Sequence, residues 1–210
     1  MKVRVNETLA KGLTKRLYDE TFNRQKSVVK HFRQIAPSKL AKRSRNNWVN
    51  NVIDVVSDVY EGAFIFITTD DGKRKKKPTI FCFSLTPEEH IRGRFVVAGW
   101  VIDTKKCHAE AVTLPIFISR HAIERVFLRL NTTNQEEVFD ELRDAFSQFI
   151  THILDKVMEN KDVIPPIGAE INLGSENGMF IGTVTEDKEI VFTTFVDNEK
   201  LSESQLSSIT

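Results

Sequence analysis

Residues Ser119–Leu130 read SRHAIERVFLRL, and the interpretation of the whole chain starts from this stretch. Apolar residues recur within it at the spacing of one helix side, namely Ala122, Ile123, Val126, Phe127 and Leu130. Ser119 stands where an N-cap hydroxyl is expected, just before the apolar period begins. The stretch therefore predicts a helix that packs one side against a core.

The opposite side of this predicted helix carries His121, Arg125 and Arg129, which follow one another at intervals of four residues. We call these three residues the basic ridge. An imidazole transfers protons near neutral pH, and guanidinium groups present paired donors that fit a phosphate. Basic residues on the polar side of a helix also commonly meet only water, so spacing alone leaves a catalytic and a solvated interpretation open.

The pattern of the remaining chain predicts an α+β protein. Residues 1–114 are expected to hold basic N-terminal helices and a four-strand meander, with helices at 6–35 and 46–60 and strands at 62–69, 78–85, 95–103 and 107–114. Residues 115–210 are expected to form a helix-helix-three-strand antiparallel lobe, with helices at 119–131 and 133–158 and strands at 169–173, 179–185 and 189–196. Thr133 and Glu136 have the spacing of a capping box at the start of the second of these helices. The two parts are either separate lobes or one continuous domain.

Composition narrows the class of protein. A chain of 210 residues with 40% hydrophobic residues can bury a proper core. Its apolar runs are too short to cross a membrane. Cys82 and Cys107 are too few for a disulfide framework or a cysteine-rich zinc site, which favours a reducing, cytoplasmic setting, and no metal or cofactor is expected. Cys82 also falls inside a strand that reads as buried, which argues against thiol catalysis.

The net charge of +1 conceals a strong asymmetry along the chain. Residues 1–46 carry +10 and residues 73–77 carry +5, which leaves −14 on the rest. Such a division indicates basic segments that bind a polyanion. Alternatively, these segments neutralise the acidic part of the same chain or of a partner protein. The candidate nucleic-acid contacts are Lys42, Arg43, Arg45, Lys73, Arg74, Lys75, Lys76 and Lys77. A solvated loop that discourages edge pairing and a nuclear localisation signal are the other interpretations of the run at 73–77.

Two motifs in residues 115–197 resemble a known superfamily. The first is Ser119-Arg120-His121-Ala122-Ile123-Glu124-Arg125, which is similar to an H-A-x-x-R helix, and the second is the late strand Ile190-Val191-Phe192-Thr193-Thr194-Phe195. Both are similar to motifs of the small ribonuclease toxins that include RelE-like toxins, colicin-type tRNA nucleases and the barnase and EndoU lineages. The resemblance implies a helix packed on an antiparallel sheet, with a strand Thr or Ser facing the helix His across the site.

This resemblance implies an endoribonuclease that cuts RNA without a metal ion. His121 would act as the base or acid, and Arg125 and Arg129 would hold the scissile phosphate. Thr193 or Thr194 would bind the phosphate or orient the imidazole, and strand alternation points only one of the two into the site. A toxin of this kind would also have an inhibitor or immunity protein as a partner.

Two other classes of function stay open at the level of sequence. In one, the protein is a non-catalytic nucleic-acid or protein-binding regulator from a mobile element or phage, in which the same cations only bind phosphate. In the other, it is an interaction protein whose basic segments pair with its acidic remainder. A nuclease needs His121 within reach of a bound phosphate, whereas a binder needs only the Arg and Lys side chains.

Overall fold

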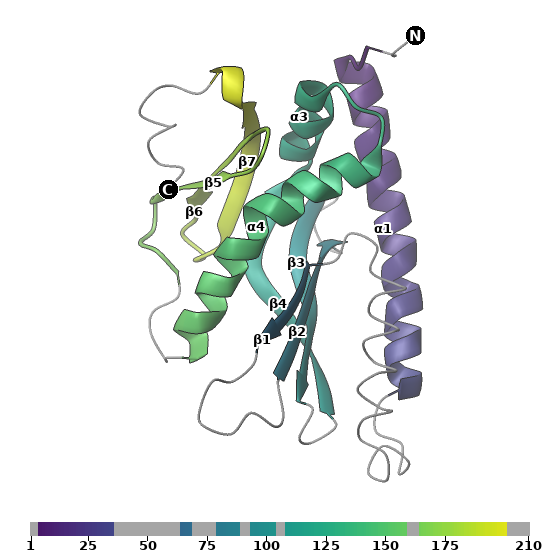
Figure 1. Ribbon diagram of the computed structural model, residues 1–210, viewed down its shortest axis with the longest axis vertical. Coiled ribbons are helices and arrows are strands. Elements are labelled where there is room, and N and C mark those ends of the chain that lie inside the picture. Colours follow the sequence, from purple (N-terminus) through teal and green to yellow (C-terminus); the bar gives the residue numbers. More distant parts are fainter. Residues whose placement is uncertain are drawn as a thin grey trace. The chain divides into compact units, whose positions relative to one another are not determined.

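The computed structural model describes residues 4–35, 64–68, 79–88, 93–103, 108–158 and 164–200. Within these ranges it has three α-helices, seven strands and one short 3-10 helix, which confirms the predicted α+β class (Figure 1). The helices are α1 (Glu7–Ile35), α3 (Arg120–Leu130) and α4 (Gln135–Met158), and the 3-10 helix is η1 (Asn198–Lys200). The strands are β1 (Phe64–Thr68), β2 (Thr79–Pro87), β3 (Arg94–Asp103), β4 (His108–Ser119), β5 (Glu170–Gly174), β6 (Gly178–Val184) and β7 (Ile190–Asp197). The helix predicted at 46–60 lies outside the described residues.

The chain divides into two compact units, each made of separate segments. The first unit comprises residues 1–19, 87–96 and 115–210, and the second comprises residues 20–86 and 97–114. The hydrogen-bonded strand order is β3-β4-β7-β6-β5 in the first unit and β1-β2-β3-β4 in the second. Both β3 and β4 contribute residues to each unit. β4 is one continuous strand that extends past residue 114.

Local sequence explains where the helices begin. Asn6 caps α1, because its Oδ1 accepts a hydrogen bond from the Leu9 amide at 2.9 Å. Asn134, rather than the predicted Thr133, caps α4, since its Oδ1 accepts from the Glu136 amide at 3.0 Å. Threonine and asparagine both suit an N-cap position. Here Asn134 occupies it, and its own backbone amide donates to the Thr132 hydroxyl.

The pairing of β4 with β7 arranges the first unit. The two strands are parallel, with Ile116 opposite Ile190 and Ile118 opposite Phe192. Residues 115–118 therefore belong to the end of β4, which extends beyond the strand predicted at 107–114. Parallel strands need a crossover connection, and here α3, α4 and the antiparallel β5–β6 hairpin supply it. Figure 1 shows α3 and α4 following one another beside strands β5 to β7.

Phenylalanine rings fill the core of the first unit. Phe146 of α4 contacts Phe180 of β6 and Phe192 of β7 edge-on, with centroids 5.4 and 4.9 Å apart. The ring centroid of Phe195 on β7 lies 4.8 Å from that of Phe180. All four side chains are at most 1% exposed. Aromatic pairs in such tilted and edge-on contacts add stability beyond the area that they bury.

The second unit brings the backbones of β2 and β3 close together at Gly99. A Cβ placed on Gly99 would lie 1.7 Å from the carbonyl oxygen of Cys82, so only glycine fits there. Cys82 itself is 1% exposed, and burial raises its pKa to about 12. Because the thiolate is the reactive form, this thiol is inert near neutral pH, as its place in a buried strand indicated.

Arg94 joins three segments of the first unit. Its Nε lies 3.0 Å from Glu88 Oε2, and its Nη2 lies 2.6 Å from Glu189 Oε2. Its guanidinium carbon also stands 3.6 Å above the ring of Phe117 on β4. The Arg94 side chain is only 17% exposed, so these charges interact with less solvent screening than surface pairs.

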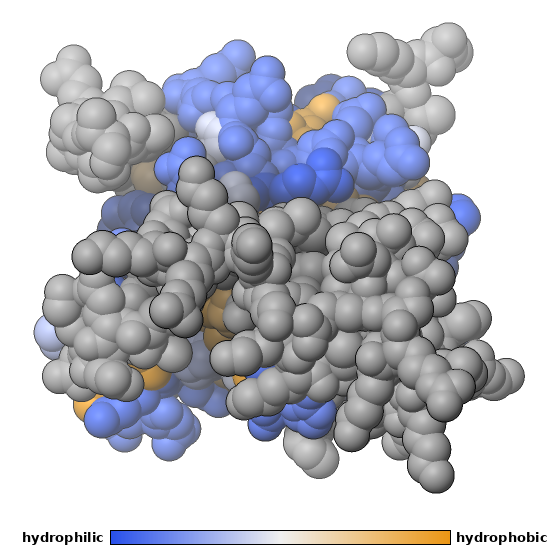
Figure 2. Space-filling view, turned by 60° about the horizontal axis from the view of Figure 1, so that its bottom comes forward, coloured by the Kyte–Doolittle hydropathy of each residue, from blue (hydrophilic) through white to orange (hydrophobic). Residues whose placement is uncertain are grey.

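On the face shown in Figure 2, the described surface is mainly hydrophilic, and hydrophobic residues show only in small patches. Where the structure describes side-chain exposure, Ile167 is the one large hydrophobic residue that is exposed, at 58%. None of the helices in the described ranges has an apolar stretch long enough to span a bilayer.

We predict opposite effects of alanine at two glycines. Gly99→Ala should lower the free energy of unfolding by about 2 kcal/mol or more, because backbone atoms must move to admit the methyl group. Gly12→Ala should raise it by about 0.5 to 1 kcal/mol, because Gly12 is in α1 with open space around it. Urea unfolding of the two variants measures both values. A neutral Gly99→Ala would contradict the close approach of β2 and β3.

We also predict that Arg94→Met lowers the free energy of unfolding by about 2 kcal/mol, because it leaves Glu88 and Glu189 without their cation. The matched control is Arg143→Met, which removes an exposed ion pair with Asp140 and should change stability by less than about 0.5 kcal/mol. Thermal or urea unfolding compares the two. Equal losses in both variants would show that the Arg94 cluster adds no more than a surface pair does.

Candidate functional site on helix α3

Ser119 attaches the start of α3 to β7. Its Oγ accepts a hydrogen bond from the Ala122 amide at 3.1 Å, which makes it the predicted N-cap. The same hydroxyl donates to the carbonyl oxygen of Thr193 at 3.1 Å. One side chain therefore both begins the helix and fixes its position against the last strand.

The predicted two-sided character of α3 is confirmed. Ala122, Ile123, Val126 and Phe127 are fully buried. At the other end of the helix, Asn131 adopts a left-handed conformation, and its Oδ1 accepts from the Val5 amide at 2.8 Å. With the helix fixed at both ends, the direction in which its polar side points is set by the fold.

The structure brings His121 and Arg125 of the basic ridge together. Arg125 Nε donates to His121 Nε2 at 3.1 Å, and the His121 side chain is 56% exposed. A neutral imidazole that accepts at Nε2 carries its proton on Nδ1. His121 Nδ1 in turn lies 3.9 Å from Oε2 of Glu124, whose side chain is 11% exposed. The imidazole thus stands between a guanidinium and a nearly buried carboxylate.

Glu124 links this pair to Arg120. Its Oε1 accepts from Arg120 Nε at 2.8 Å, while Oε2 is the oxygen nearest His121. Arg120, four residues earlier on the helix, is therefore its salt-bridge partner. The approach of Glu124 to His121 was not anticipated, although their spacing of three residues places both on one side of a helix.

Arg129 is directed elsewhere. Its Nε lies 3.4 Å from Asp197 Oδ2 at the end of β7, and Lys200 lies 3.8 Å from the same oxygen. The Arg129 side chain is 26% exposed. Of the three ridge residues, His121 and Arg125 therefore contact each other, and Arg129 is engaged with a carboxylate.

Thr193 and Thr194 occupy an irregularity in β7. Ile181 of β6 pairs with Thr194, but the next residue, Gly182, pairs with Phe192, so Thr193 is an extra residue in a β-bulge. Thr193 is exposed and Thr194 is half-buried. Strand alternation therefore does not hold at this point. Among the described contacts, none joins either threonine side chain to His121.

The remaining predicted site residues cannot be placed. Lys42, Arg43, Arg45 and the basic residues at 73–77 lie outside the described residues. Within the part of the chain that the structure describes, no three His, Cys, Asp or Glu side chains gather in a group that could hold a metal ion.

No protein-family model, curated protein or solved structure matches the chain.

We predict that Ser119→Ala lowers the free energy of unfolding by about 1 kcal/mol or more, because it removes an N-cap and a bond to β7 together. Ser119→Asp should restore the cap but not the donated bond, and so should recover part of this loss. Ser147→Ala, which alters a serine inside α4, is the control and should change stability by less than about 0.5 kcal/mol. Urea unfolding distinguishes them, and a silent Ser119→Ala would show that α3 is positioned by packing alone.

Proposed function

We propose that the protein acts on RNA, and that His121 and Arg125 bind a phosphodiester on the exposed side of α3 and cleave it without a metal ion. The observation that carries the proposal is the position of His121 Nε2, 3.1 Å from the guanidinium that would hold the phosphate. The resemblance of residues 119–125 and 190–195 to ribonuclease toxins supports the same assignment.

The reaction needs a base at the 2′-hydroxyl next to the scissile phosphate. In the free protein, Arg125 occupies the Nε2 lone pair of His121. A charged phosphate oxygen is a stronger acceptor than a neutral imidazole, so a bound phosphate would draw the Arg125 donors to itself and free that lone pair. His121 then takes the proton of the 2′-hydroxyl, whose oxygen attacks phosphorus. The bond to the 5′-oxygen breaks, water protonates the leaving oxygen, and a 2′,3′-cyclic phosphate remains.

Glu124 lies beside the imidazole that takes up this proton. Its Oε2 is 3.9 Å from His121 Nδ1, and its Oε1 is paired with Arg120. Arg125 offsets the charge that develops on the phosphorane. The exposed Thr193 is the better placed of the two threonines to reach a phosphate oxygen. Arg129 is a weaker candidate, since it would first have to leave Asp197.

A second candidate function is binding of nucleic acid without cleavage, as in a regulator from a mobile element or phage. The observation that favours it is the 56% exposure of the His121 side chain, because water surrounds the group that would act as base. In this case Arg125 and the basic residues outside the described ranges supply the contacts. If the protein is instead a toxin, an inhibitor or immunity protein that covers α3 is the expected partner.

We predict that the protein cleaves RNA in the presence of EDTA and that two substitutions remove the activity. His121→Ala should slow cleavage at least about 100-fold, because it removes the base. Arg125→Ala should slow it by a similar factor, and Arg125→Lys should recover only part, because a lysine supplies a single point charge. Arg143→Ala on α4 is the matched control for loss of an exposed arginine and should cleave normally.

The same assay, paired with a binding measurement at two salt concentrations, decides between the two candidates. Intact RNA with salt-dependent binding that Arg125→Ala weakens would support the regulator and refute catalysis. Intact RNA without any binding would refute both. Cleavage that persists in His121→Ala would place the chemistry at another site.

A further inference from the structure

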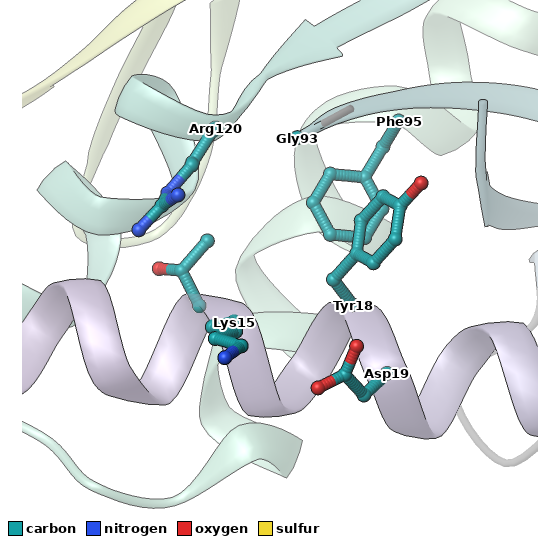
Figure 3. A pocket seen from close by; sticks show the side chains of 7 residues that line it. Lys15, Tyr18, Asp19, Gly93, Phe95 and Arg120 are labelled. Atoms are coloured by element: carbon teal, nitrogen blue, oxygen red, sulfur yellow. The ribbon is translucent and has the colours of Figure 1, made fainter. Parts of the chain in front are cut away.

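A cavity of about 350 Å³ lies beside the start of α3, within the first unit. Its lining comes from three segments that are distant in sequence: Thr14, Lys15, Tyr18 and Asp19 of α1, Gly93 and Phe95 at the start of β3, and Arg120 of α3. Figure 3 shows Arg120 pointing toward α1 and the ring of Phe95 beside that of Tyr18. The volume is within the range of cavities that hold small organic ligands.

Thr14 contributes a hydroxyl without a partner. The residue is 1% exposed, and its Oγ1 has no hydrogen-bond partner among the described residues. A threonine inside a helix usually donates to the carbonyl four residues earlier, so a buried hydroxyl that does not do so is unusual. Leaving it unpaired costs stability, and an acceptor on a bound molecule would satisfy it.

Arg120 is fixed in place before any ligand binds. Its Nε is held by Glu124, and its Nη2 lies 3.5 Å from the carbonyl oxygen of Lys11 on α1. Gly93 leaves room for its stem, because a Cβ there would lie 3.2 Å from the Arg120 Cδ and the backbone φ is +91°. A cation that is already positioned loses little conformational entropy on binding an anion.

An aromatic wall stands next to these polar groups. The hydroxyl of Tyr18 donates to the carbonyl oxygen of Glu88 at 3.0 Å, which fixes the orientation of its ring. The ring of Phe95 meets it edge-on with centroids 5.5 Å apart, and Phe95 is fully buried. Tyr18 therefore offers a fixed apolar surface to a planar group.

The two ends of the cavity differ in charge. Arg120 reaches Lys11, whereas Asp19 lies two turns further along α1, roughly 12 Å away along the helix axis. Thr14 lies nearer the Arg120 end, and Lys15 lies midway between the two. A ligand that uses both ends must be elongated, with an anion at one end and a hydrogen-bond donor at the other. The α-ammonium and α-carboxylate groups of an amino acid lie on the same carbon, so these two groups cannot reach both ends.

We propose that this cavity binds a nucleotide. Arg120, Lys15 and the Thr14 hydroxyl hold the phosphate, the base lies along the ring of Tyr18, and Asp19 accepts a hydrogen bond from the exocyclic amino group of the base. The nucleotide is either free in solution or one residue of an RNA chain. His121 does not line the cavity, so this inference does not depend on RNA cleavage.

Isothermal titration of the full chain with AMP tests the proposal. AMP should bind at concentrations below about 1 mM, and adenosine and inorganic phosphate should each bind at least about tenfold more weakly, because each lacks half of the contacts. UMP should bind more weakly than AMP, because uracil has no exocyclic amino group for Asp19. The dinucleotide ApA separates the two sources: binding tighter than that of AMP indicates an RNA residue, and weaker binding indicates a free nucleotide.

Three substitutions locate the binding. Lys15→Met should weaken AMP binding about tenfold or more, and Thr14→Val about three- to tenfold, since they remove a charged and a neutral donor. Lys11→Met, one turn earlier on α1, is the matched control and should bind AMP like the wild type. Thr14→Val should leave the Tm unchanged or raise it, whereas a structural hydroxyl would lower it. No binding of AMP, or binding that Lys15→Met and Thr14→Val leave unchanged, would overturn the proposal.

Discussion

The parallel pairing of β4 with β7 is the constraint on which the first unit depends. It brings residues 116–118 beside residues 190–192, and the segment between them has to cross over. α3 begins directly where β4 ends, so the position of the strand fixes where the helix starts. The Ser119 hydroxyl stabilises this junction by donating to the Thr193 carbonyl oxygen. The direction of every side chain on α3 follows from this arrangement. The position of His121 is therefore a property of the sheet as much as of the helix.

Charge pairing decides which cations on α3 remain available. Arg120 is held by Glu124, and Arg129 lies beside Asp197. Arg125 contacts a neutral imidazole instead of a carboxylate, and a neutral acceptor is the easiest of the three to displace. Arg129 is thus tied to a carboxylate, Arg120 faces the cavity beside α1 while its Nε stays with Glu124, and Arg125 is the one of the three that can exchange its partner. This difference in pairing, more than the number of positive charges, makes the His121–Arg125 pair the candidate phosphate site.

The sequence predicted several features that depend on nearby residues. The period of α3, its Ser119 cap and the placing of His121 and Arg125 on one side of the helix all arise within a few residues of one another. The engagement of Arg129 could not be read in this way, because Asp197 reaches it only through the placement of β7. The bulge at Thr193 also gives no local signal: two adjacent threonines suit a regular strand, and only the register against Gly182 shows the extra residue. The cavity beside Tyr18 was missed because its lining comes from three distant segments, and Gly93 became notable only through its φ of +91°.

The distance in sequence between β4 and β7 has a consequence for how the chain folds. Ser119 and Thr193 are 74 residues apart, so their contact closes a long loop, whereas β5, β6 and β7 follow one another through short turns. Contacts between distant residues form slowly, because the chain must lose the conformational entropy of the loop before these contacts stabilise it. The β5–β7 meander is therefore expected to form early, before β4 pairs with β7. The end of β4 and the first turn of α3 are completed last, so a chain acquires its ordered His121 only when folding is finished.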